Sequence, residues 1–226
     1  MNKSGFYNID CMEGMKQIPD KYFELAIVDP PYGINIGKMN YVNSGAIKIG
    51  SAYRRDYRGQ GQWDNNAPTQ EYFDELFRVS KRQIIWGGNY FTRELEPTKS
   101  WIIWDKRIEE KYSNDFADCE MAWCSDGVAR IFRYLYSGML QGNMKNKDDR
   151  FHPTQKPTVL YKWLLKNYAK KGDKILDTHV GSASSLIACY DLGFEYLGFE
   201  LDTDYYNMAT DRLNKHISQL NLLLDF

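Results

Sequence analysis

Residues 174–184 read Lys-Ile-Leu-Asp-Thr-His-Val-Gly-Ser-Ala-Ser, and this stretch decides the fold class. It predicts a buried strand, an acidic residue at the end of that strand, a tight loop and the start of a helix. A loop of small residues at a helix N-terminus lets a ligand approach the backbone N–H groups. Glu200 ends the next predicted strand, at the spacing at which a Rossmann-like unit places an acid on a ribose. These features indicate a nucleotide-type cofactor, and NAD would suit them equally well.

Short apolar runs followed by helix-like stretches recur along the rest of the chain. This alternation is typical of an α/β fold with a mostly parallel sheet and helices on both faces. The predicted strands are residues 5–9, 25–28, 83–86, 101–104, 121–124, 174–176 and 196–199. The predicted helices are residues 11–17, 69–80, 158–169, 184–191 and 204–218.

The composition narrows the class of protein. The chain has 226 residues, of which 43% are hydrophobic and 15% aromatic, so it can bury a core and is expected to form a single domain, 1–226. No apolar run approaches the ~18–20 residues that span a bilayer, and no apolar signal region opens the chain, so we expect a cytoplasmic protein without membrane contact. The cysteines suggest neither a disulfide framework nor, at the spacing of Cys119 and Cys124, a metal site.

The sharpest chemical signal follows the predicted strand 25–28. Asp29, Pro30, Pro31 and Tyr32 stand where ligands gather in an open α/β sheet, at the carboxyl end of a strand. The two prolines fix φ and carry no N–H, so the backbone leaves the strand in a stiff conformation. The Asp29 carboxylate and the Pro30 carbonyl then offer two acceptors to an amino group, and the Tyr32 ring offers a flat surface to an aromatic base. A tight turn capped by an aspartate is the alternative interpretation.

Two stretches do not fit the alternation of strands and helices. Residues 34–64 are rich in Gly, Asn, Ser, Tyr and Arg, and residues 127–150 combine basic and aromatic side chains. Lys and Arg outnumber acids in 34–64 and in 127–174, whereas 175–226 is acidic. Long irregular loops are usually functional, and such charge asymmetry suggests a polyanion bound on one face. Surface insertions and solvated helix faces would explain the same pattern.

A third motif precedes the predicted helix 158–169. Residues 152–157 read His-Pro-Thr-Gln-Lys-Pro, in which Thr154 and Lys156 could present a hydroxyl and a cation to a carboxylate. The residues alone favour an ordinary helix entry. Asn89 and Tyr90, after the predicted strand 83–86, either line a pocket or belong to a turn at Gly87 and Gly88.

Together the three motifs resemble those of the DNA amino-methyltransferases that use S-adenosylmethionine. Residues 29–32 are similar to their catalytic motif, 177–184 to their cofactor loop and 152–157 to the segment before that loop. The order, with the catalytic motif first, resembles the beta group, and the resemblance covers nearly the whole chain. The aspartate at the head of the catalytic motif resembles the adenine-specific members. The cofactor loop departs from the family's Gly-Ser-Gly at Ala183.

The resemblance implies a seven-stranded, Rossmann-like class I methyltransferase sheet and S-adenosyl-L-methionine as the cofactor. The implied catalytic residues are Asp29, Pro30, Pro31 and Tyr32. The implied cofactor contacts are Asp10, Cys11, Asp29, Thr154, Lys156, Asp177, Thr178, Val180, Gly181, Ser182, Glu200 and Leu201. Of these, Asp177 and the loop 180–182 would hold the methionine end, Glu200 the ribose, and Asp10 with Cys11 the adenine ring.

The implied substrate is the exocyclic amine of adenine in double-stranded DNA, which must be flipped out of the helix to be reached. Segment 34–64 would form a mobile lid and segment 106–150 a target-recognition region. Phosphate contacts are expected from Arg54, Arg55, Arg58, Arg130, Arg133, Lys145 and Lys147. A cognate restriction endonuclease and a homodimer are further implied partners. The open alternatives are cytosine in DNA, adenine in RNA, a protein amide, a DNA-binding regulatory subunit with a weak cofactor site, and a nicotinamide oxidoreductase.

Overall fold

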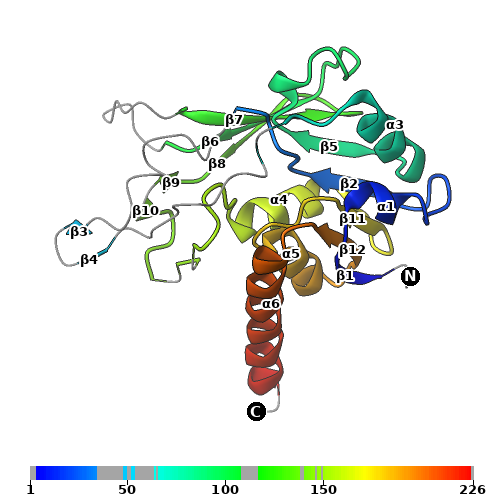
Figure 1. Ribbon diagram of the computed structural model, residues 1–226. Helices are drawn as coiled ribbons and strands as arrows, with labels where there is room; N and C mark the ends of the chain where they lie inside the picture. The colour runs from blue at the N-terminus through cyan, green and yellow to red at the C-terminus, as the bar shows by residue number, and fades with distance from the viewer. Residues whose placement is uncertain are drawn as a thin grey trace.

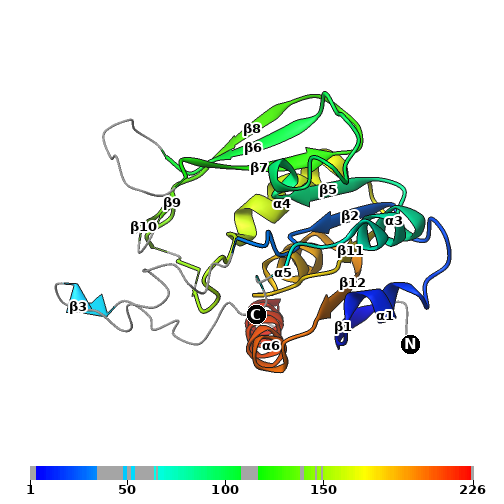
Figure 2. The same cartoon turned by 45° about the horizontal axis from the view of Figure 1, so that its top comes forward.

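The computed structural model describes residues 4–34, 48–49, 52–53, 64, 66–107, 117–137, 140–145, 147–148 and 150–224. Within these residues, helices cover both faces of one large sheet, as Figures 1 and 2 show. The predicted α/β class is confirmed. Most of the predicted lid 34–64 and part of the predicted target-recognition region 106–150 lie outside the described residues.

The described part of the sheet has eight strands in the order β1-β12-β11-β2-β5-β7-β6-β8. Their bounds are β1 Gly5–Asn8, β2 Leu25–Val28, β5 Gln83–Trp86, β6 Trp101–Asp105, β7 Cys119–Cys124, β8 Arg130–Arg133, β11 Lys174–Asp177 and β12 Glu195–Glu200. The first five strands in this order pair in parallel, whereas β7 runs antiparallel to both of its neighbours. All seven predicted strands are present, with ends shifted by up to two residues.

The expected number of seven strands is wrong because of β8. This strand pairs in parallel with β6 and lies in a stretch for which no regular structure was predicted. Arginines stand at both ends of this four-residue strand, and Phe132 is its only buried residue. Its sequence therefore lacks the continuous apolar run that marks a buried strand. The described residues also form two small antiparallel pairs of strands outside the large sheet. These are β3 (Lys48–Ile49) with β4 (Ala52–Tyr53), and β9 (Tyr136–Ser137) with β10 (Leu140–Gln141).

The helices form two layers, one on each face of the sheet (Figures 1 and 2). The helices are α1 (Cys11–Met15), α3 (Gln70–Val79), α4 (Thr158–Tyr168), α5 (Ser184–Leu192), α6 (Thr203–Leu224) and the short 3₁₀ helix η3 (Gly88–Tyr90). Side chains of α4 and α5 share one core with alternate residues of the strands, and those of α1 and α3 share a second core on the opposite face. Burial on both faces explains why β2 is a continuous apolar run and why β5 is apolar after Gln83.

Helix α6 extends beyond its predicted end at residue 218. Its first turns pack on α5 through Tyr205, Ala209 and Leu213, and its C-terminal part runs away from the sheet (Figure 1). None of the described helices combines the length and apolarity needed to cross a membrane.

The parallel half of the sheet brings four carboxylates to one edge. Strands β1, β12, β11 and β2 are neighbours, and each ends at or just before an acidic residue, namely Asp10, Glu200, Asp177 and Asp29. Because parallel strands end at the same edge, residues far apart in the sequence meet there.

Candidate active site

The turn after β2 is held in place by a residue from the far end of the long irregular stretch. Oδ1 of Asp64 accepts hydrogen bonds from the backbone N–H of Tyr32, at 2.7 Å, and of Gly33, at 3.0 Å. The side chain is almost fully buried, because Asp64 is only 2% exposed. Together with the fixed φ of Pro30 and Pro31, these bonds set the conformation in which Asp29 and Tyr32 are presented.

Asp29 lies in a buried network of charged and polar groups. Its Oδ1 accepts a 2.7 Å hydrogen bond from the Tyr32 hydroxyl, and its Oδ2 accepts one from Nζ of Lys156. Lys156 also contacts Oε2 of Glu120 at 3.1 Å. Burial raises the pKa of Asp29 above its ordinary value, the ammonium of Lys156 opposes this shift, and the charge of Glu120 adds to it. The two carboxylates in turn raise the pKa of Lys156.

The Tyr32 ring is part of an aromatic stack. Tyr90 lies nearly parallel to it, with 4.9 Å between ring centroids and 17° between planes, and Phe91 meets it edge-on. Tyr90 is 49% exposed, so its ring forms the outer layer of this stack. Of the two interpretations left open for Asn89 and Tyr90, the turn at Gly87 and Gly88 is confirmed, because the Tyr90 N–H donates a 2.8 Å bond to the Gly87 carbonyl.

Two adjacent glycines allow close packing here, the first against the Tyr32 ring and the second against β7. Gly87 has φ +70°, and a Cβ there would overlap the Tyr32 ring. A Cβ on Gly88 would overlap Cβ of Trp123 on β7.

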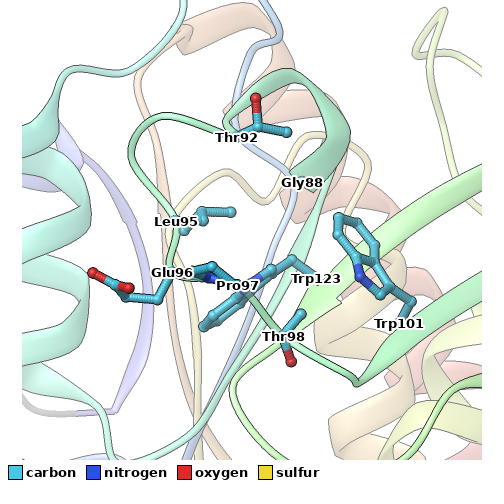
Figure 3. A pocket seen from close by; sticks show the side chains of 8 residues that line it. All are labelled: Gly88, Thr92, Leu95, Glu96, Pro97, Thr98, Trp101 and Trp123. Carbon is cyan, nitrogen blue, oxygen red and sulfur yellow. Dashed lines mark hydrogen bonds between the residues drawn. The ribbon is translucent and has the colours of Figure 1, made fainter.

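Gly88 also borders a pocket between η3 and the strands, lined by Trp101, Trp123 and the loop 92–98 (Figure 3). None of the residues lining that pocket belongs to the catalytic turn or to the loop after β11.

Two carboxylates hold the loop after β11, Asp177 at the end of β11 itself and Glu200 at the end of the neighbouring strand β12. Asp177 accepts hydrogen bonds from the hydroxyl of Ser185 and from the backbone N–H of His179, and burial raises its pKa to about 7. Oε2 of Glu200 accepts a 2.8 Å bond from the backbone N–H of Gly181. Burial also raises the pKa of Glu200. The predicted cofactor residues Asp177, Gly181 and Glu200 therefore lie together.

Ala183, which stands where the resembled family has glycine, adopts a left-handed backbone conformation. Ala183 is fully buried and has φ +62°, a conformation that glycine adopts more readily. A non-glycine residue in this region costs about 1–2 kcal/mol. The loop conformation therefore forms with an alanine at this position, and helix α5 begins directly after it.

The residues predicted to hold an adenine ring lie at the start of α1. The Asp10 side chain caps this helix by accepting bonds from the backbone N–H groups of Met12 and Glu13. Cys11 lies 4.0 Å from Nε2 of His179, whose Nδ1 contacts the hydroxyl of Thr178 at 2.9 Å. Burial raises the pKa of Cys11 to about 12 and lowers that of His179 to about 4, so the pair is a neutral thiol and a neutral imidazole.

The third motif is divided between two places. Thr154 contacts Nδ1 of His152 at 3.1 Å, and the His152 ring faces Gly181 of the cofactor loop. Lys156 instead reaches Asp29 and Glu120. Of the two residues expected near a methionine carboxylate, the structure places Lys156 on Asp29, the predicted catalytic aspartate.

The predicted phosphate-binding residues are placed only in part. Arg130 and Arg133 lie on β8 and are exposed, with Arg133 paired to Asp105 at 3.3 Å. Lys145 and Lys147 are exposed in the segment after β10. The remaining three, Arg54, Arg55 and Arg58, lie outside the described residues.

Sequence reasoning missed two residues that contact the predicted catalytic motif or its partner Lys156. Glu120 was overlooked because the strand was predicted to begin after it, at 121. Asp64 carried no signal, because its partners are backbone N–H groups 31 and 32 residues earlier. The turn at Gly87 and Gly88 was expected as one alternative, but the sequence does not show which ring Gly87 makes room for.

The edge of the sheet suits a ligand that carries positive charge. Burial is the main cause of the raised pKa values of Asp29, Asp177 and Glu200, and the negative charges of Asp29 and Glu200 repel that of Asp177 and raise its pKa further. A bound cation would relieve this repulsion. A sulfonium and an ammonium group, both present in S-adenosylmethionine, have the required charge.

Comparisons with known proteins agree with the fold described above. The model of a family described as DNA methylase, N6_N4_Mtase, matches residues 90–211. The type II methyltransferase M.HinfI of Haemophilus influenzae is 26% identical over 91% of this chain and 67% of its own length. M2.DpnII of Streptococcus pneumoniae is 28% identical over 64% of this chain, which spans about half (53%) of that relative. The crystal structure of the M1.HpyAVI–SAM complex superposes with a TM-score of 0.55 at 17% identity, covering 92% of this chain and 98% of the other.

Proposed function

Because the chain belongs to the DNA methylase family, we propose that it transfers a methyl group from S-adenosyl-L-methionine to the exocyclic amine of adenine in double-stranded DNA. The observation that carries the proposal is the position of Asp29. Its carboxylate stands at the end of β2, beside the glycine loop that follows the adjacent strand β11. An amine held by Asp29 would therefore lie next to a cofactor held by that loop.

The cofactor would be bound along the edge formed by four strands. Asp177 and residues 180–182 would hold its methionine end, Glu200 with Leu201 its ribose, and Asp10 with Cys11 its adenine ring. When bound, it supplies an electrophilic methyl group on a sulfonium. Lys156 is not assigned to this cofactor, because its ammonium is already shared by two carboxylates.

Asp29 and the Pro30 carbonyl would prepare the substrate amine for attack. The lone pair of an adenine amine is delocalised into the purine, so the nitrogen is a poor nucleophile. Two acceptors that take its hydrogens bias it toward tetrahedral geometry and free the lone pair. Alignment of the two reactants can itself lower the barrier by ~7–11 kcal/mol.

The Tyr32–Tyr90 stack would receive the flipped base. Stacking of a base on an aromatic side chain is worth ~1–3 kcal/mol, which offsets part of the cost of removing the base from the duplex. Exposed basic residues such as Arg130 and Lys145 would contact phosphates. A restriction endonuclease partner, a homodimer and a cytoplasmic location belong to the same proposal.

The test is mass analysis of nucleosides from DNA incubated with the protein and S-adenosylmethionine. N6-methyladenine is the expected product. N4-methylcytosine would replace the proposal by its nearest alternative, and methylated RNA adenine by the second. Calorimetry separates the regulatory-subunit alternative, which requires that S-adenosylmethionine produce no binding heat and no protection against unfolding.

A further inference from the structure

Lys156 is a buried cation shared by two carboxylates from different strands. The residue is 4% exposed, and its Nζ contacts Asp29 after β2 and Glu120 on β7. The other oxygen of Glu120 contacts Nζ of Lys106 at 3.2 Å, so Glu120 stands between two cations. A buried ammonium requires such partners, because an unpaired charge in the interior is costly.

This arrangement conflicts with the task assigned to Asp29. One of its oxygens is engaged by the Tyr32 hydroxyl and the other by Lys156. Positive charge develops on the substrate nitrogen as it attacks the methyl group, and an ammonium on the same carboxylate opposes that development. Lys156 must therefore release Asp29, at least in part, when an amine arrives.

The structure contains an acceptor for the released cation. Glu120 lies 3.1 Å from Nζ of Lys156. A small shift therefore moves the ammonium from one carboxylate to the other, and the buried charge keeps a partner throughout. Resting on the proposed function, we propose that Glu120 is a positioning residue for methyl transfer, which draws the Lys156 ammonium away from Asp29 when the substrate amine binds.

The removal of Glu120's charge has a second, measurable consequence. The groups facing Asp29 are Lys156 before α4, Glu120 on β7, Tyr32 in its own turn, Tyr161 on α4, Tyr72 on α3 and Asp177 on β11. Of these, Glu120 raises the pKa of Asp29 through its negative charge. Its neutralisation should therefore lower the pKa of Asp29.

The experiment compares Glu120→Gln with Glu120→Asp and with a control, Glu75→Gln. Glu75 on α3 is likewise a partly buried glutamate paired with a cation, Arg78 at 2.7 Å, and lies in none of the proposed catalytic or binding segments. Single-turnover methylation should slow by roughly tenfold or more in Glu120→Gln, with the affinity for S-adenosylmethionine unchanged. The acidic limb of the pH–rate profile should move to lower pH. Glu120→Asp should recover part of the rate, and Glu75→Gln should methylate at the wild-type rate.

A second variant shows whether Glu120 acts through Lys156. In a Lys156→Met background, Glu120→Gln should cause little additional loss, because no ammonium remains to be drawn away. A loss that persists undiminished in that background, or a Glu120→Gln enzyme with wild-type rate and pH profile, overturns the inference while leaving the proposed function intact. A wild-type protein that methylates no DNA base overturns both. Thermal unfolding of each variant identifies any that fails to fold.

Discussion

The hydroxyl of Tyr32 donates a 2.7 Å hydrogen bond to Oδ1 of Asp29, three residues earlier in the same turn. The hydroxyl therefore orients the carboxylate, while the ring of the same residue stacks on Tyr90. Burial and the neighbouring carboxylates raise the pKa of Tyr32 far above its ordinary value, so the hydroxyl remains a donor. The two roles can be separated by mutation.

Tyr32→Phe should keep the stack and lose only the bond to Asp29, whereas Tyr32→Ala should lose both. We expect a modest decrease in kcat/KM for the phenylalanine variant and a further decrease of about 1–3 kcal/mol in transition-state stabilisation for the alanine variant. Methylation kinetics on a duplex oligonucleotide measure both. Equal losses would show that the hydroxyl, rather than the ring, is the important group.

Asp29→Ala should abolish methyl transfer and leave binding of S-adenosylmethionine within a few-fold of wild type. The variant removes the acceptor for the amine, while Lys156 keeps Glu120 as a partner and the Asp64 bonds to the turn remain. Calorimetry gives the affinity, and a methylation assay gives the rate. A normal rate in this variant would contradict the acceptor role of Asp29.

Gly87→Ala should impair the site beyond the cost of its backbone conformation. Gly193 is a matched control, because its φ of +72° is close to the +70° of Gly87 and no atom lies within 4 Å of a Cβ built there. Each substitution should cost about 1–2 kcal/mol of unfolding free energy from the left-handed conformation alone. Only Gly87→Ala should also displace Tyr32 and slow methylation. If Gly193→Ala slows methylation equally, the clash with Tyr32 is not the cause.

Asp177→Asn should change how stability depends on pH. The pKa of Asp177 is raised from 3.8 to about 7, so the folded protein binds its proton more tightly than the unfolded chain does. This contribution to stability is present at low pH and is lost as the pH rises from about 4 to about 7, by an amount on the order of 4 kcal/mol.

The measurement is the difference in unfolding free energy between wild type and Asp177→Asn across this window, without cofactor. The comparison is needed because burial lowers the pKa of His152 to about 3 and that of His179 to about 4, which acts in the opposite direction as the pH rises. The wild type should lose stability relative to the variant as the pH increases. A constant difference would show that Asp177 has an ordinary pKa in the folded protein.

Much of the fold was predictable because burial on both faces leaves a local signal. Strand β2 is a continuous apolar run and β5 is apolar after Gln83, and the predicted bounds of both agree with the structure. Strand β8 lies at the edge of the sheet, where a strand needs few apolar residues, so its sequence resembles a loop. The turn after β2 and the loop after β11 were also predictable as local structure, because each is a combination of strand end, acid and turn residues.

The local sequence pattern shows which residues stand at the carboxyl ends of the strands, and parallel pairing then brings Asp29, Asp177 and Glu200 to one edge of the sheet. The partners of those residues follow only from the three-dimensional packing. Lys156 is separated from Asp29 by 127 positions, and Glu120 meets both across the sheet. Strand ends follow from the local pattern of burial, whereas the pairing of buried charges depends on distances that are set only when the strands, loops and helices have packed together.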